Sequence, residues 1–211
     1  MASPTDHPTL LSRLIVLEGI DGAGTTTQAR LLGRRIRDAG RSLWSTSEPT
    51  SGPIGQLLRS VLSGATPVSP QTAAYLFAAD RAEHVFGSHG IVAHHAAGEV
   101  VVCDRYVYSS YAYQSVDVDA ELVLALNAPF PYPGLFIFVD LPVEVTAQRL
   151  ARRKSREIYE TRSFQEKVHD NYSRIIDIAR THTTVAVVDG TQSAERISEK
   201  IWESVRDASI V

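Results

Sequence analysis

Apolar residues recur along the chain in five short, nearly continuous runs. The runs cover residues 14–17, 42–45, 100–103, 135–139 and 184–188, and the longer intervals between them carry mostly helical patterns. Strands that are apolar on both faces are typical of a parallel sheet covered by helices. The alternation therefore predicts an α/β fold with a five-stranded, mainly parallel sheet and helices on both of its faces.

The composition is consistent with one folded unit. The chain has 211 residues, of which 44% are hydrophobic, a size that one domain can accommodate. Residues 1–12 are mostly small or polar and include two prolines, so we expect a flexible N-terminus there. A single domain is then expected over residues 13–211.

Charge and cysteine content narrow the function classes. No stretch resembles a membrane span or a secretory signal, so we expect a cytoplasmic protein with no membrane partner. A net charge of -3 offers no general positive field, and nucleic acid is therefore not an expected partner. The single cysteine, Cys103, lies in an apolar run and is expected to be a buried strand residue.

A glycine-rich motif follows the first apolar run. Residues 19–27 read Gly-Ile-Asp-Gly-Ala-Gly-Thr-Thr-Thr, which matches the phosphate-binding pattern GxxxxGK[ST] except at its lysine, where Thr25 stands. Glycines let backbone amides face an anion, and the helix predicted over residues 28–38 adds its free amides and dipole. The motif thus predicts a phosphate cradle without the mobile ammonium, with a simple tight bend as the alternative.

A carboxylate and a guanidinium come directly after the third apolar run. Because ligands collect at the carboxyl ends of parallel strands, we expect Asp104 and Arg105 to lie near the glycine loop. Asp104 and the Thr26 hydroxyl are oxygen donors suited to Mg²⁺, and Arg105 can hold a second phosphate. An ion pair between Asp104 and Arg105 that only caps the strand is the simpler alternative.

A further candidate site lies in a helix expected to begin after Ser69-Pro70, an N-cap followed by proline at the first helical position. Phe77 and Arg81 are four residues apart and therefore share a helix face. A ring beside a guanidinium suits a nucleobase, which the ring can stack on and the guanidinium can bond. The spacing fits equally well a core aromatic next to a solvated charged face.

Together these motifs resemble the thymidylate kinase family over about residues 13–202. Besides the glycine loop, they are Phe-Ala-Ala-Asp-Arg-Ala-Glu-His at 77–84, Asp-Arg-Tyr at 104–106 and Ser-Ser-Tyr-Ala-Tyr-Gln at 109–114. The resemblance implies a P-loop kinase fold with a short lid at about residues 150–160. It also implies transfer of the γ-phosphoryl group of ATP to dTMP with Mg²⁺, for dTTP synthesis, usually by a homodimer.

The resemblance further implies a role for each matching residue. Phe77 would stack on thymine, Arg81 would bond the edge of the base, Arg105 would grip the acceptor phosphate, and Tyr113 would crowd the sugar 2′ position. The implied ATP site comprises Gly19, Ile20, Asp21, Gly22, Ala23, Gly24, Thr25, Thr26, Thr27 and Arg149, the last near the adenine. The implied acceptor site comprises Glu48, Pro49, Phe77, Arg81, Arg105, Ser109, Tyr113 and Gln114. Metal ligation falls to Thr26 and Asp104, and catalysis to Asp21, Asp104, Arg105, Arg153 and Arg156.

Two positions depart from the family pattern, namely Thr25 and Ser47, the latter standing where many members have arginine. Loss of one well-placed cation costs a phosphoryl-transfer enzyme roughly 10³- to 10⁵-fold in rate. We therefore hypothesise that Arg153 and Arg156 of the basic lid segment supply the missing charge, although a solvated helix end would also explain that segment. The alternative functions are a kinase for another pyrimidine nucleotide or nucleoside, and a nucleotide-binding or regulatory protein with weak catalysis.

Overall fold

Five parallel strands form the centre of the computed structural model, which describes residues 9–150, 158–159 and 161–211. The strands are β1 (Leu10–Glu18), β2 (Leu43–Ser47), β3 (Val100–Asp104), β4 (Tyr132–Asp140) and β5 (Thr184–Asp189). Their order across the sheet is β2-β3-β1-β4-β5, and every neighbouring pair is parallel. The five apolar runs therefore identified all the strands of this sheet.

Two strands begin earlier than their apolar runs suggest. β1 starts at Leu10, which pairs with Tyr132 at the start of β4, so residues 10–12 belong to the sheet and not to a terminal segment. The pairing shifts register between Leu11 and Ile15, where the polar Ser12 and Arg13 interrupt the apolar pattern. This irregularity explains why periodicity detected the strand only from Leu14 onward.

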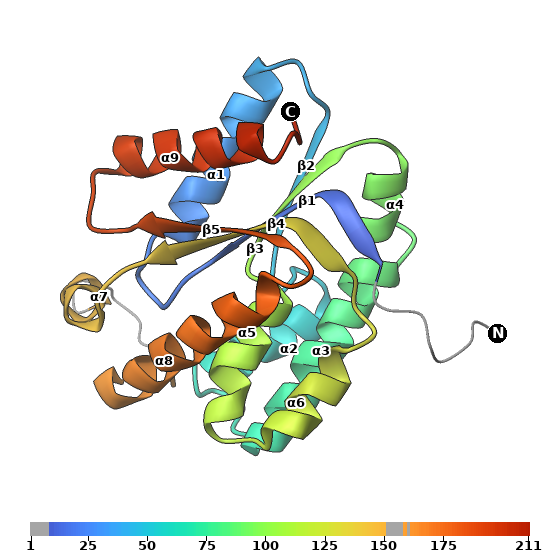
Figure 1. Ribbon diagram of the computed structural model, residues 1–211. Coiled ribbons are helices and arrows are strands. Elements are labelled where there is room, and N and C mark those ends of the chain that lie inside the picture. The colour runs from blue at the N-terminus through green and yellow to red at the C-terminus, as the bar shows by residue number, and fades with distance from the viewer. Residues whose placement is uncertain (1–8, 151–157, 160) are drawn as a thin grey trace.

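Helices cover both faces of the sheet, as predicted (Figure 1). One face carries α1 (Thr25–Asp38) and α9 (Ala194–Asp207), and the other carries α5 (Val107–Tyr113) and α8 (Arg162–Ala179). The remaining helices are α2 (Pro53–Leu62), α3 (Pro70–Phe86), α4 (Ile91–Ala96), α6 (Ala120–Asn127) and α7 (Val143–Leu150), with a short 3₁₀ turn, η1, at Gln114–Val116. Within the described segments no helix is both long and apolar enough to cross a bilayer.

Alternation along the strands divides the core into two layers. Ile15 and Leu17 of β1 face α1 and α9, where they meet Leu32 and Ile201, whereas Val16 faces the opposite layer. Since successive strand residues point to opposite faces, a strand buried on both sides is apolar throughout. The core therefore holds the carboxyl ends of the strands in fixed positions, and the polar loops that follow them are anchored there.

The predicted start of α3 is confirmed. The Ser69 side chain accepts a hydrogen bond from the Thr72 amide at 3.1 Å, and Pro70 occupies the first turn. This cap fixes the register of the helix, and with it the positions of Phe77, Arg81 and His84 relative to the sheet.

Candidate active site

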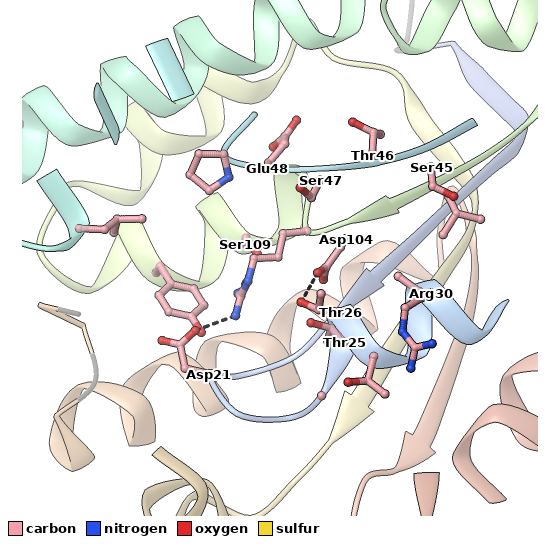
Figure 2. Close-up of a pocket in the computed structure, with 18 of the residues that line it drawn as sticks. Asp21, Thr25, Thr26, Arg30, Ser45, Thr46, Ser47, Glu48, Asp104 and Ser109 are labelled. Carbon is pink, nitrogen blue, oxygen red and sulfur yellow. Dashed lines mark hydrogen bonds and ion pairs between the residues drawn. The ribbon is translucent and has the colours of Figure 1, made fainter. Parts of the chain in front are cut away.

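The ends of three neighbouring strands open into one cavity of about 700 Å³. Asp104 of β3 pairs with Leu17 of β1 on one side and with Ser47 of β2 on the other. The loops that follow these three residues therefore begin at the same level of the sheet. The cavity is lined by the glycine loop, by residues 45–49, by Phe77 and Arg81 of α3, and by Asp104, Arg105, Ser109, Tyr113 and Gln114 (Figure 2). This arrangement brings together the motifs that the strand-end argument placed in one cleft.

The glycine loop has the backbone conformation of an anion cradle. Gly22 and Gly24 adopt φ values of 87° and 95°, in the left-handed region that favours glycine. A Cβ on Gly19 would lie 2.8 Å from the Ala23 Cβ, so a side chain there would obstruct the turn. The first helical bond of α1 runs from the Gln28 amide to the Gly24 carbonyl, which leaves the amides of residues 25–27 for a ligand.

The loop residues divide into two groups. Asp21, Gly22 and residues 24–27 line the cavity, whereas Gly19, Ile20 and Ala23 form the buried turn beneath it. The Ala23 amide donates to the Ile20 carbonyl at 3.0 Å, which closes that turn. The second group therefore shapes the cradle without contributing to its surface.

Thr25 cannot replace the charge of the lysine that the loop pattern specifies. Its side chain is only 6% exposed, and its methyl carbon lies 3.2 Å from the position that a Cβ on Gly19 would take. The methyl group therefore packs into the turn. The positive charge in the described part of the cavity comes from arginines instead, namely Arg30, Arg37, Arg59, Arg81 and Arg105.

Thr26 and Asp104 form a pair of oxygen ligands. The Thr26 hydroxyl donates to Asp104 Oδ2 at 2.5 Å, as the dashed line in Figure 2 shows, while buried Asp104 Oδ1 has no partner among the described residues. An unpaired buried carboxylate oxygen carries a desolvation cost that a bound cation would offset. A carboxylate, a hydroxyl and nearby phosphate-binding amides suit a hard divalent cation, so these residues fit Mg²⁺.

Arg105 is oriented by Asp21, and not by Asp104. Its Nη2 donates to Asp21 Oδ1 at 2.7 Å, its Nη1 donates to Ser109 Oγ at 3.3 Å, and its guanidinium carbon lies 5.2 Å from the centre of the Tyr113 ring. The alternative of an Asp104–Arg105 ion pair is therefore wrong. Arg105 also adopts a φ of 70°, a strained conformation for a residue with a side chain, and such strain concentrates at functional sites.

Arg81 lines the cavity, but its guanidinium is only 1% exposed. Nε donates to Glu48 Oε2 at 2.9 Å, and Nη2 contacts the same oxygen at 2.7 Å and the Tyr106 carbonyl at 3.2 Å. Nη1 donates to Ser110 Oγ and Asn127 Oδ1. These contacts direct the Arg81 guanidinium at protein acceptors, and a bond from Arg81 to the edge of a base, which the resemblance implied, stays a prediction.

Glu48 is held between Arg81 and His84. Its Oε1 lies 2.9 Å from His84 Nδ1, and His84 Nε2 lies 2.6 Å from the Thr46 hydroxyl. Burial would raise the pKa of Glu48, but the Arg81 charge and the contacts with His84 outweigh it and lower the pKa below its usual value. The carboxylate therefore stays ionised and fixes the end of β2 against α3.

The remaining predicted residues fall into three groups. Pro49, Phe77, Ser109, Tyr113 and Gln114 line the same cavity, as the resemblance implied. Arg149 donates to the Gly22 and Gly190 carbonyls at 3.2 and 3.3 Å, so it links the glycine loop to the loop after β5. Arg153, Arg156 and most of the predicted lid lie outside the described residues.

Sequence reasoning missed several side chains. Glu18 is fully buried at the end of β1 and accepts hydrogen bonds from the Tyr106 and Ser109 amides and from the Ser109 and Tyr172 hydroxyls. Gln165 of α8 bonds Asp21, and Arg30 lies along the cavity one turn after Thr26. The sequence could have indicated Glu18, because a charged residue at the end of an apolar strand is unusual. No pattern in the sequence indicates Gln165.

These features define a class of protein. A parallel α/β domain with a glycine-loop cradle, an oxygen pair for a divalent cation and an arginine at a neighbouring strand end has the parts of a phosphoryl-transfer enzyme. The family model described as thymidylate kinase matches residues 17–201. The chain therefore belongs to the thymidylate kinase family and is a nucleoside monophosphate kinase.

Relatives whose names contain the words thymidylate kinase are similar over nearly the whole chain. A protein of Treponema pallidum (strain Nichols) is 40% identical over 202 residues, which cover 94% of this chain and 97% of the relative. One of Methanococcus aeolicus is 34% identical over 205 residues, covering 95% and 100%. One of Pyrococcus horikoshii is 40% identical over 200 residues, covering 91% and 95%.

Proposed function

We propose that the chain transfers the γ-phosphoryl group of ATP to dTMP in this cavity, giving dTDP and ADP. The observation that carries the proposal is the convergence of three elements: the amide-lined loop, the Thr26–Asp104 oxygen pair and Arg105. Phosphoryl transfer needs positioning and charge stabilisation rather than covalent chemistry by the protein. The cavity supplies both kinds of group in one place.

Thr26 and Asp104 are the proposed ligands of Mg²⁺, because their oxygens fit a hard cation and Asp104 Oδ1 has no partner in the described part of the chain. When bound, the ion neutralises charge on the donor phosphates. The amides of residues 24–27 would bind the same phosphates, and Arg105 would hold the acceptor phosphate. Phe77 is the proposed stacking surface for the base, with Ser109, Tyr113 and Gln114 around it.

Arginines are the proposed replacement for the absent loop ammonium. Arg30 follows Thr26 by four residues and lines the same cavity, and long side chains of a helix lean toward its N-terminus, so Arg30 is one candidate. Arg153 and Arg156 stay the lid candidates that the sequence proposed. If separate alanine substitutions of Arg153 and Arg156 leave turnover of dTMP unchanged, compensation by these two side chains is wrong.

A product assay tests the proposed reaction. The chain is incubated with ATP, Mg²⁺ and one of dTMP, dUMP, dCMP or dGMP, and the diphosphate product is separated by chromatography. We expect dTDP as the preferred product, whereas preference for another pyrimidine would favour the alternative kinase. Nucleotide binding by calorimetry, with no product after long incubation, would favour a regulatory protein.

The variant that tests the metal site is Asp104→Asn, which keeps the shape of the side chain but removes its charge. We expect kcat for dTMP phosphorylation to fall by about 10²- to 10³-fold, because a charged group that helps to stabilise the transition state is lost. The melting temperature should change little in comparison. Wild-type kcat in this variant would exclude Asp104 from the metal site.

From the family resemblance, we propose that the protein is a homodimer and is located in the cytoplasm. Leu57 on α2, Tyr75 on α3 and Leu124 on α6 are exposed apolar side chains, and α3 contacts both α2 and α6, so these helices are the proposed contact with a second copy. Light scattering should give twice the chain mass. A monomer at assay concentrations would contradict the proposed dimer and leave the proposed reaction intact.

A further inference from the structure

We propose that Gln165 is a positioning residue for the acceptor phosphate, acting through Asp21 and Arg105; the inference rests on the proposed function of the cavity. Gln165 lies in the first turn of α8, is 1% exposed, and is 144 residues from Asp21 in the chain. No motif in the sequence singles it out.

The Gln165 amide group meets the glycine loop at two points. Its Nε2 donates to Asp21 Oδ2 at 2.8 Å, and its Oε1 accepts the Asp21 backbone amide at 3.1 Å. Asp21 then presents its other oxygen, Oδ1, to Arg105 Nη2 at 2.7 Å. Gln165 therefore determines which face of the Asp21 carboxylate is left for Arg105.

The second Nε2 hydrogen of Gln165 is also used. It donates to the Tyr159 carbonyl at 2.9 Å, and Tyr159 also lines the cavity. A buried amide with both hydrogens and its oxygen paired is held in one orientation. Gln165 thus ties the glycine loop, the wall formed by Tyr159 and α8 into one rigid unit.

The same helix anchors the other side of Arg105. Tyr172 of α8 donates to Glu18 Oε2 at 2.8 Å, Glu18 accepts the Ser109 hydroxyl at 2.6 Å, and Ser109 Oγ accepts Arg105 Nη1 at 3.3 Å. The polar contacts form a closed circuit that begins and ends on α8. Arg105 is therefore held from both sides, and Gln165 is the link that orients the Asp21 side.

Gln165→Ala tests the inference, with Asn171→Ala as the matched control. Asn171 also lies on α8 and donates one hydrogen bond, to the Ala112 carbonyl at 2.9 Å, but it does not contact Asp21. We expect Gln165→Ala to lower kcat/KM for dTMP by about 10- to 100-fold, because a small misplacement of a positioning group has effects of this size. The effect should appear chiefly in KM for dTMP and in dTMP binding by calorimetry, while Asn171→Ala leaves both near their wild-type values.

Two further experiments test whether Gln165 acts through Asp21 or only through its packing in α8. In an Asp21→Ala background, Gln165→Ala should add little further loss, since its target is already absent. Gln165→Glu should place two carboxylates face to face, so its activity should recover as the pH is lowered from about 8 to about 6 and one shared proton removes the repulsion. The wild type should lack this acid recovery.

The outcomes separate the inference from the proposed function. An inactive wild type would refute the proposed function, whatever the variants do. An active wild type would overturn the inference if Gln165→Ala behaved like Asn171→Ala, if its effect were fully additive with Asp21→Ala, or if Gln165→Glu lacked the acid recovery.

Discussion

At the residue scale, two arginines in the cavity wall differ in what surrounds them. The Arg81 side chain is 1% exposed and bonded on every side by protein, whereas the Arg105 side chain is 23% exposed and bonded to Asp21 and Ser109. A buried, paired guanidinium is mainly structural, because removing it leaves the Glu48 carboxylate buried without its partner. The more exposed guanidinium is the one positioned to meet a ligand.

Arg81→Ala should therefore lower the free energy of unfolding by about 3 to 5 kcal/mol, the usual cost of breaking a buried ion pair. Urea denaturation followed by circular dichroism measures this change. Arg105→Ala is the paired variant and should lose much less stability but at least about 10²-fold in kcat/KM for dTMP. If Arg81→Ala kept wild-type stability and lost only dTMP binding, Arg81 would be a reader of the base after all.

The sequence could place Arg81 on a helix face but could not assign its partners. Glu48, Tyr106, Ser110 and Asn127 come from three other segments of the chain, and only the packing of α3 against them determines the contacts. The choice between Asp21 and Asp104 as the partner of Arg105 depended in the same way on the backbone turn after β3. Motif spacing contains neither piece of information.

At the element scale, Glu18 of β1 serves as the cap of α5. The N-cap residue of this helix, Tyr106, provides no side-chain cap, and the Tyr106 and Ser109 amides donate instead to Glu18 Oε1 at 2.8 and 3.1 Å. The strand that leads into the glycine loop therefore also fixes the helix that carries Ser109 and Tyr113. This explains how the donor and acceptor sides of the cavity keep one relative position.

The burial of Glu18 makes stability depend on pH. Burial raises the pKa of Glu18 from 4.5 to about 7, although its bonds to Ser109, Tyr172 and Tyr106 and the Arg105 charge oppose the rise. The folded state thus binds the proton more tightly than the unfolded state. The resulting stabilisation is complete below pH 4.5 and is lost as the pH rises through about 7, with a total on the order of 3 kcal/mol.

Glu18→Gln should remove this pH dependence. The difference in unfolding free energy between wild type and variant, measured by urea denaturation from about pH 5 to about pH 8, should change steadily in favour of the variant as the pH rises. Other titrating groups cancel in the difference, since both proteins contain them. A difference that stays constant with pH would show that Glu18 does not titrate in this range.

Most elements were predictable because their signals are local. Apolar runs gave the five strands, the Ser69-Pro70 cap gave the start of α3, and the spacing after the glycine loop gave α1. The early part of β1 was not predicted because Ser12 and Arg13 break its apolar pattern, and the start of β4 was not predicted because Pro131 and Pro133 interrupt the apolar residues there. Pairing of Leu10 with Tyr132 decided both cases, and such pairing is a tertiary event.

At the scale of the whole molecule, the order of the strands determines which charged groups surround the glycine loop. The loop pattern without lysine suggests a weak site, yet the sheet order β2-β3-β1 brings two further strand ends to the same cavity. These ends and α1 add Asp104, Arg105 and Arg30 to the backbone cradle. We propose that Arg105 and Arg30, which come from other elements of the fold, supply the positive charge that the loop lacks at Thr25.

The most direct test of this account compares kcat for dTMP phosphorylation in the wild type and in Thr25→Lys, at saturating ATP, Mg²⁺ and dTMP. Thermal melting of both proteins confirms that each is folded. If arginines supply the charge, as proposed, the wild type turns over and the lysine raises kcat by less than about tenfold. A wild type without measurable turnover, together with a gain of about 10³-fold or more in Thr25→Lys, would contradict the account.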